Sequence, residues 1–105
     1  MNDIEKQFAD LQQGKESALC FLMNTYATAL QFFAFKLTRS KEVSSEIVSD
    51  SFVKLWDRRC KLQGHDNIKP FLYVVTRNAC LDYLKHSRNK HPHQEASLLE
   101  SDNSD

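Results

Sequence analysis

The sequence predicts an all-α fold, a small bundle of three or four helices in one domain. Apolar residues recur every three or four positions along most of the chain, which is the spacing of one helix face. Only two glycines and two prolines occur among the 105 residues, too few for the many tight turns of an all-β domain. With 41% hydrophobic residues, the chain can bury a core without disulfides or a metal.

The first two helices are expected over about Asp3–Gln13 and Ser17–Thr38, with Gly14 suited to ending the first. The apolar positions of the first helix are Ile4, Phe8 and Leu11. Those of the second are Leu19, Leu22, Tyr26, Leu30, Phe33, Ala34 and Leu37. Phe32 and Phe35 widen the apolar arc of the second helix, which is therefore predicted to be the central one with its phenylalanines in the core.

A third helix is expected over about Lys41–Arg59, with Ser40 as its N-cap. Its core side comprises Val43, Ile47, Val48, Phe52, Leu55 and Trp56. Trp56 is predicted to be buried against the second and fourth helices. The opposite side presents Glu46, Ser49, Asp50, Val53 and Asp57.

A loop over Lys61–Asn67 precedes a fourth helix, which extends to about Lys90 and can be capped by Asn67. Pro70 falls in its first turn, where a missing N–H does no harm. At 100° per residue, its apolar side comprises Ile68, Phe71, Leu72, Val75, Ala79 and Tyr83. The other side carries Lys69, Tyr73, Arg77, Lys85 and Arg88, with Asn78 at its edge.

Charge is divided into blocks that cancel. Nine basic residues balance nine acidic ones from Met1 to Ile68, five basic residues accompany one acid from Lys69 to His93, and four acids follow from Gln94 to Asp105. The net charge of zero therefore combines a basic fourth helix with an acidic tail. Cations bind phosphates, an aromatic ring stacks on a base and an amide can recognise a base edge. Single-stranded or partly opened nucleic acid is therefore the expected partner.

The sequence gives less support to an enzyme, a disulfide-bonded protein or a zinc-binding protein. No phosphate-binding loop and no paired catalytic carboxylates occur, so neither an enzyme nor a cofactor is expected. The three cysteines are odd in number and form no Cys-x-x-Cys pair, so free thiols in a reducing, cytoplasmic setting are expected. Possible zinc ligands are His86, His91 and His93 with Cys60 or Cys80. Their spacing does not match that of a zinc-binding motif, so no zinc site is expected.

Three further alternatives concern the class of protein. Uninterrupted apolar runs are only a few residues long, so no membrane span is expected, and the acidic N-terminus differs from a secretory signal. A conventional helix-turn-helix module would need two short helices around a tight turn, which the pattern does not show. A helical protein-interaction module stays open as the alternative function, although it would not need Asn78 and Arg77 beside Tyr73.

Three segments together resemble a known family. They are Ala18–Leu22 (ALCFL), Glu46–Trp56 (EIVSDSFVKLW) and Ile68–Leu84 (IKPFLYVVTRNACLDYL). They resemble, in order and spacing, region 2 of the bacterial extracytoplasmic-function sigma factors, over roughly Phe8 to Lys90. The resemblance implies a domain at residues 1–90, with residues 91–105 as an acidic tail that opens a linker. Members normally continue into a helix-turn-helix domain for the −35 element, so we expect an excised domain.

The resemblance also implies partners and sites. Such domains bind core RNA polymerase through the clamp helices of its β′ subunit, and recognise and help to melt the −10 promoter element. Polymerase binding is assigned by position to Glu46, Ser49, Asp50, Val53 and Asp57, where the family usually has Gln-Glu at positions 49 and 50. A base flipped from the −10 non-template strand would meet a loop wall formed by Lys61, Leu62, Gln63, Gly64 and His65, with Asn78 on the helix side. An anti-sigma factor is a further candidate partner.

Overall fold

The computed structural model describes residues 2–90, and only the backbone of residues 88–90. Within this part of the chain there are four α-helices, one short 3-10 turn and no strand. The elements are α1 (Asp3–Gln12), α2 (Glu16–Thr38), α3 (Lys41–Asp57), η1 (His65–Asn67) and α4 (Ile68–Lys90). The all-α prediction is confirmed, and the helix bounds lie within two residues of those expected. Asn67, expected as a cap, lies in η1, which leads directly into α4.

Local capping groups explain where α1 and α3 begin. The side chain of Asn2 accepts a hydrogen bond from the backbone N–H of Glu5 at 2.8 Å, and the Glu5 carboxylate accepts one from Asn2 at 3.1 Å. This reciprocal capping box starts α1. Ser40 accepts from the N–H of Val43 at 3.1 Å and caps α3, as its position predicted. Gly14, in the turn after α1, has a φ of 84°, a conformation that side chains disfavour.

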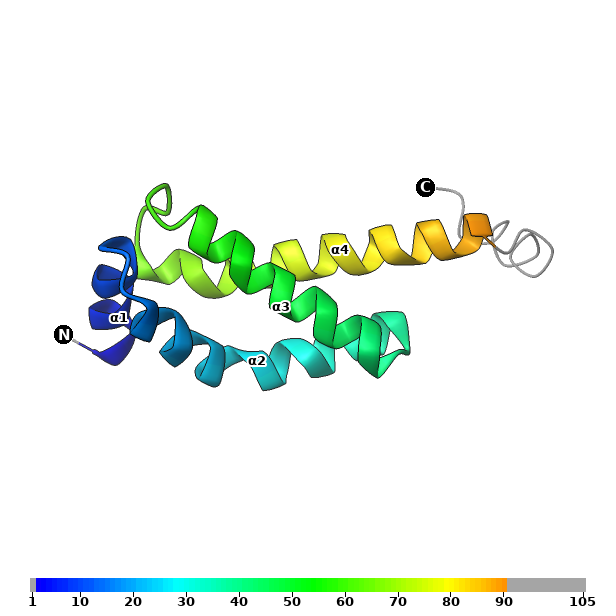
Figure 1. Ribbon diagram of the computed structural model, residues 1–105, viewed down its shortest axis with the longest axis horizontal. Coiled ribbons are helices and arrows are strands. Elements are labelled where there is room, and N and C mark those ends of the chain that lie inside the picture. The colour runs from blue at the N-terminus through cyan, green and yellow to red at the C-terminus, as the bar shows by residue number, and fades with distance from the viewer. Residues whose placement is uncertain (1, 91–105) are drawn as a thin grey trace.

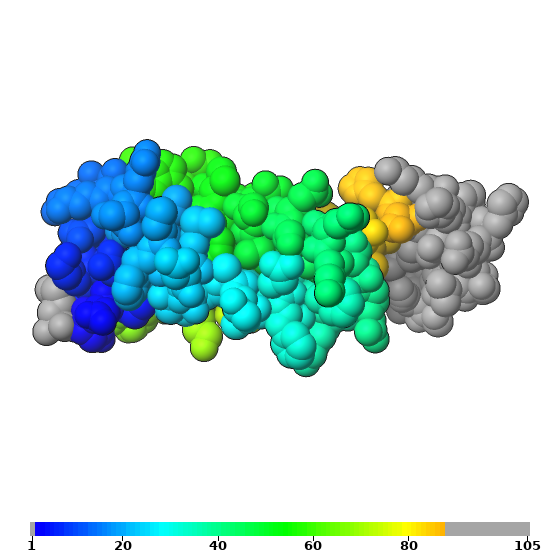
Figure 2. All heavy atoms as spheres, turned by 60° about the horizontal axis from the view of Figure 1, so that its bottom comes forward, coloured from blue at the N-terminus to red at the C-terminus, as the bar shows by residue number. Residues whose placement is uncertain are grey.

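The three long helices run along the molecule in alternating directions, and α1 lies across the end where α2 and α4 begin (Figure 1). α3 packs against both α2 and α4, which also pack against each other. The domain is elongated, with extents of 53, 23 and 19 Å. The outer sides of α2 and α3 lie side by side on one face of the molecule (Figure 2). Each of the three long helices has exposed residues along one side.

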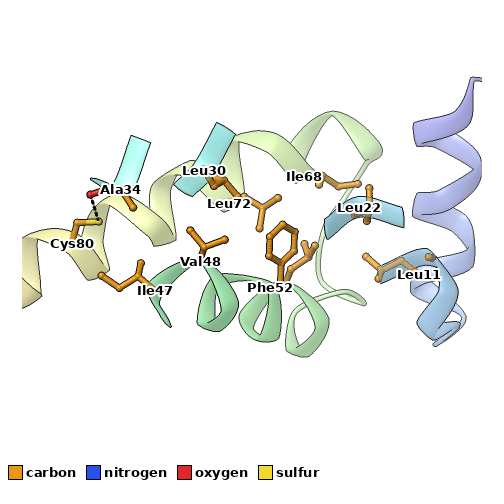
Figure 3. Close-up of a cluster of buried hydrophobic side chains, with 12 residues drawn as sticks. Leu11, Leu22, Leu30, Ala34, Ile47, Val48, Phe52, Ile68, Leu72 and Cys80 are labelled. Carbon is orange, nitrogen blue, oxygen red and sulfur yellow. Dashed lines mark hydrogen bonds between the residues drawn. The ribbon is translucent and has the colours of Figure 1, made fainter. Parts of the chain in front are cut away.

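The core is a continuous apolar cluster between the three long helices (Figure 3). Phe52 of α3 points toward Leu72 of α4, and Leu22 of α2 extends the cluster to the α1 end, where Leu11 closes it. At the other end, the buried Cys80 thiol donates a weak hydrogen bond to the Ala34 carbonyl at 3.9 Å. Burial raises the pKa of the Cys80 thiol.

The buried side of α4 differs from the expected one. Its fully buried residues are Ile68, Leu72, Thr76 and Cys80, spaced four apart. Phe71, Val75, Ala79 and Tyr83, expected to share the apolar side with Ile68 and Leu72, are only half-buried at its margins. Thr76 can lie in the core because its hydroxyl pairs with that of Ser51 at 2.8 Å. A count of apolar residues alone cannot detect such a hydroxyl pair.

Aromatic residues of α2 and α3 are also less buried than expected, and Phe33 and Phe35, predicted to lie in the core, are only half-buried. Trp56 packs against the core but is half-buried, and the guanidinium of Arg59 lies 4.2 Å from the centre of its ring. Phe32 is 64% exposed on the outer side of α2, where the ammonium of Lys36 lies 4.8 Å from its ring. The wide apolar arc of α2 therefore extends beyond the core onto the surface.

α2 is long and apolar enough, by length and composition alone, to cross a membrane. The central helix of a water-soluble bundle meets the same criterion. In this structure α2 packs against α1, α3 and α4, which accounts for the apolar residues on its buried side. Phe32, on its outer side, is not explained by this packing.

Candidate functional site

The outer face of α3 combines acids with one exposed apolar side chain. Its five members are all exposed; they are Glu46, Ser49, Asp50, Val53 and Asp57. At about 100° per residue they fall within an arc of roughly 100°, opposite the buried Val48, Phe52 and Leu55. Val53 is 56% exposed and lies between carboxylates one turn away on either side. The structure thus brings together all five residues expected to bind the polymerase, which we call the α3 face.

The outer face of α4 has a different chemistry. Arg77, Asn78 and Lys85 are exposed there, and Val74 and Leu81, which are 55% and 41% exposed, lie between them on the helix. The three polar residues were expected on this side of the helix, and the two apolar ones were not. Their spacing of four and three residues from Asn78 could have revealed them. These five residues form the α4 face; Arg88 follows in the same helix, with its side chain outside the described residues.

Lys69 is exposed but lies on another side of α4. It lines a groove of about 450 Å³ near the end of the bundle covered by α1, together with Asn2, Ile4, Tyr26, His65, Asp66 and Pro70. Desolvation in this region raises the pKa of the Tyr26 hydroxyl. At about 100° per residue, Lys69 is turned by roughly 80° from Arg77 and by roughly 160° from Lys85. The basic side expected for the fourth helix is therefore divided between this groove and the α4 face.

Tyr73 does not lie on the exposed side where it was expected. It is half-buried, and its ring packs edge-on against Phe33 of α2, with ring centres 5.1 Å apart and planes at 65°. Tyr73 precedes the buried Thr76 by three residues and Cys80 by seven, so it shares their side of the helix. Its ring is committed to the contact between α2 and α4.

The loop before α4 divides the five residues expected to form the wall of a base pocket. Lys61 and Gln63 are exposed, whereas Leu62 is half-buried against the core and Gly64 is extended. His65 turns toward α1, with Nε2 at 3.0 Å from the Asp66 carboxylate and Nδ1 at 3.8 Å from that of Glu5. His65 therefore lines the groove with Lys69.

A shallow apolar depression lies where the loop meets α4. It has a volume of about 330 Å³ and is lined by Leu62, Asn67, Pro70, Phe71 and Val74. Asn78 follows Val74 by four residues and Phe71 by seven, so its amide is one turn beyond the rim. Apolar walls can hold a flat ring, and a nearby amide offers a donor and an acceptor to its edge.

Comparison with known proteins identifies the family of this chain. A family model for sigma-70 region 2 matches residues 22–90, more than half of the chain. The chain belongs to the sigma-70 region 2 family. The predicted resemblance to a sigma region 2 domain is thereby confirmed, while the extracytoplasmic-function subclass stays a prediction. No curated protein and no solved structure matches the chain.

The matched range of this sigma-70 region 2 domain begins within α2 and includes all of α3, the loop and α4. The α3 face, the depression and the α4 face thus lie inside it, while α1 lies outside. Within residues 2–90 no three His, Cys, Asp or Glu side chains are grouped so that they could hold a metal ion. His91 and His93 fall outside the described residues.

Proposed function

We propose that this sigma-70 region 2 chain binds core RNA polymerase through the α3 face and contacts the −10 promoter element through the α4 face and the adjoining depression. Family membership supports polymerase binding and promoter melting in general. The assignment to faces rests on one observation: neighbouring helices expose an acidic face and a face with cations and an amide.

The α3 face suits a helical partner with basic residues, as expected of the β′ clamp helices. Its carboxylates, Glu46, Asp50 and Asp57, complement positive charge, and Val53 offers apolar area at the centre. Ser49 is small and lets a partner helix approach closely. A partner such as an anti-sigma factor that covered this face would compete with the polymerase.

The α4 face suits an opened DNA strand. Arg77 and Lys85 can bind phosphates, while Asn78 is placed to recognise a base edge and the depression to hold an extruded base. Extrusion costs a few kcal/mol, which the contacts in the depression must offset. Lys61 and Gln63 are exposed beside it, and Lys69 would meet a strand that continues along the groove toward α1. Tyr73 receives no stacking role because its ring packs on Phe33.

This role is that of a cytoplasmic, non-enzymatic transcription subunit without a cofactor. The test combines the chain with core polymerase and a forked promoter fragment, and measures co-elution and crosslinking to each DNA strand. Co-elution with crosslinks from α4 to the −10 non-template strand is the expected result. Co-elution without DNA crosslinks would favour the alternative, a helical interaction module, and absence of co-elution would contradict polymerase binding.

A further inference from the structure

The end of α1 is hydrogen-bonded to the loop that borders the depression. Gln12, the last residue of α1, is half-buried, and its Nε2 donates to the carbonyls of Arg59 at 3.0 Å and Leu62 at 3.1 Å. An amide nitrogen has two hydrogens, so one side chain engages both carbonyls. These carbonyls are three residues apart, and Gln12 therefore spans the turn between them.

Other contacts hold the same turn against α1 and the end of α3. The Cys60 thiol donates to the backbone carbonyl of Gln12 at 3.9 Å. Arg59 donates to the Trp56 carbonyl at 2.8 Å while its guanidinium lies over the Trp56 ring. Among the described residues, Gln12 is the side chain from a distant helix that binds the backbone of this turn. Its removal would leave two carbonyls without their donors.

We infer that Gln12 is a positioning residue for promoter recognition, acting through the backbone of Leu62. The Leu62 side chain lines the depression with Phe71 and Val74, and Gln12 fixes its carbonyl. Ordering loop residues at the moment of binding costs conformational entropy, so a loop ordered in advance improves the capture of an extruded base. The inference rests on the proposed function, and it assigns a role to α1, which lies outside the range matched by the family model.

The test compares Gln12→Glu with Gln13→Glu, both assembled with core polymerase. Glutamate has nearly the shape of glutamine but, when ionised, donates no hydrogen bond and repels carbonyl oxygens. Gln13 is exposed and adjacent, so the control carries the same added charge. Two readouts are taken: the ratio of affinities for matched and mismatched −10 strands, and hydrogen exchange of the amides of residues 59–63.

Gln12→Glu should lower the affinity ratio about tenfold, the order expected for two lost hydrogen bonds. It should also accelerate exchange in the loop while leaving polymerase affinity unchanged, and Gln13→Glu should behave as the wild type in every readout. Gln12→Met, which removes the donors without adding charge, serves if the glutamate variant does not fold.

An unchanged affinity ratio or unchanged loop exchange in the Gln12 variant would overturn the inference. A fall in polymerase affinity equal to the loss of DNA affinity would also overturn it, because that pattern reports general destabilisation. If the wild type itself shows no −10 preference, the proposed function fails and this inference fails with it. Loss of the preference in Asn78→Ala but not in the Gln12 variant would overturn the inference alone.

Discussion

Among single residues, two equally exposed valines show how the α3 face and the α4 face differ. The difference lies in the charged and polar side chains around each valine. Val53 on α3 and Val74 on α4 are 56% and 55% exposed, and both are large apolar residues in solvent. Carboxylates lie one turn away from Val53, whereas Arg77 and Asn78 lie one turn beyond Val74. The same substitution at each position should therefore affect a different partner.

Val53→Asp should weaken binding to core polymerase at least about tenfold, because it places an unpaired charge at the centre of an apolar contact. Val74→Asp is the matched control, with the same exposure and the same added charge. It should leave polymerase affinity unchanged and weaken DNA binding by the assembled complex. Titration of labelled chain with core polymerase measures the first effect, and equal losses for the two variants would place the interface elsewhere.

Arg77 and Asn78 are neighbours in sequence and should differ in how they contribute to DNA binding. Removing a phosphate contact with Arg77→Ala should weaken all sequences alike and reduce the salt slope by about 0.7 for a single strand. Asn78→Ala should cost about 1–3 kcal/mol on the preferred −10 sequence only. Affinities of the assembled complexes for matched and mismatched strands at two salt concentrations measure both effects. An equal loss on both strands for Asn78→Ala would rule out base recognition.

At the scale of elements, the sequence predicts the helices well because the signals that start and end them are local. Ser40 caps α3 through the adjacent Val43, and Pro70 lies in the first turn of α4, as expected. The sides of α4 are less predictable because they depend on distant partners. Thr76 can be buried because its hydroxyl pairs with that of Ser51, and the ring of Tyr73 packs against Phe33 of α2.

In the candidate site, too, the sequence predicts features that depend on local spacing and does not predict contacts between distant segments. All members of the α3 face were predictable, since periodicity alone places them opposite the core. The contact of Gln12 with the loop was not, because it joins residues separated by 47 and 50 positions and follows no periodic pattern. The turn of His65 toward Glu5 likewise depends on where α1 crosses the bundle.

The contribution of the Ser51–Thr76 hydroxyl pair to the packing of α3 on α4 can be measured. Ser51→Ala should lower the free energy of unfolding by about 1–2 kcal/mol, because it leaves the buried Thr76 hydroxyl without a partner. Thr76→Val should cost less, because the Ser51 hydroxyl still donates to the Ile47 carbonyl at 2.9 Å. The double variant should lose less than the sum of the two, since both polar groups are then gone. Urea unfolding measures the cycle, with Ser49→Ala on the exposed side of α3 as a neutral control. Strict additivity would mean that the pair contributes no coupling.

At the scale of the whole molecule, the bundle is thin enough for its two faces to influence each other electrostatically. Its shorter extents are 23 and 19 Å, below the Debye length of about 30 Å at 0.01 M salt and well above the value of about 8 Å at 0.15 M. Carboxylates on α3 should therefore repel DNA from the free chain at low salt. Polymerase bound to the α3 face would neutralise them, which couples core binding to promoter contact without any conformational change.

One substitution should then act with opposite sign on the two partners. Asp50→Asn removes an exposed carboxylate from the α3 face, so it should weaken polymerase binding while raising the affinity of the free chain for single-stranded DNA. We expect the gain to be about twofold at 0.01 M salt and to vanish near 0.15 M, where exposed charges this far apart are screened. Fluorescence anisotropy of labelled DNA at both salt concentrations measures it, and Asp50→Glu, which keeps the charge, is the control. A gain in DNA affinity that persisted at 0.15 M, or that appeared in Asp50→Glu as well, would exclude long-range repulsion and indicate that the DNA contacts α3 directly.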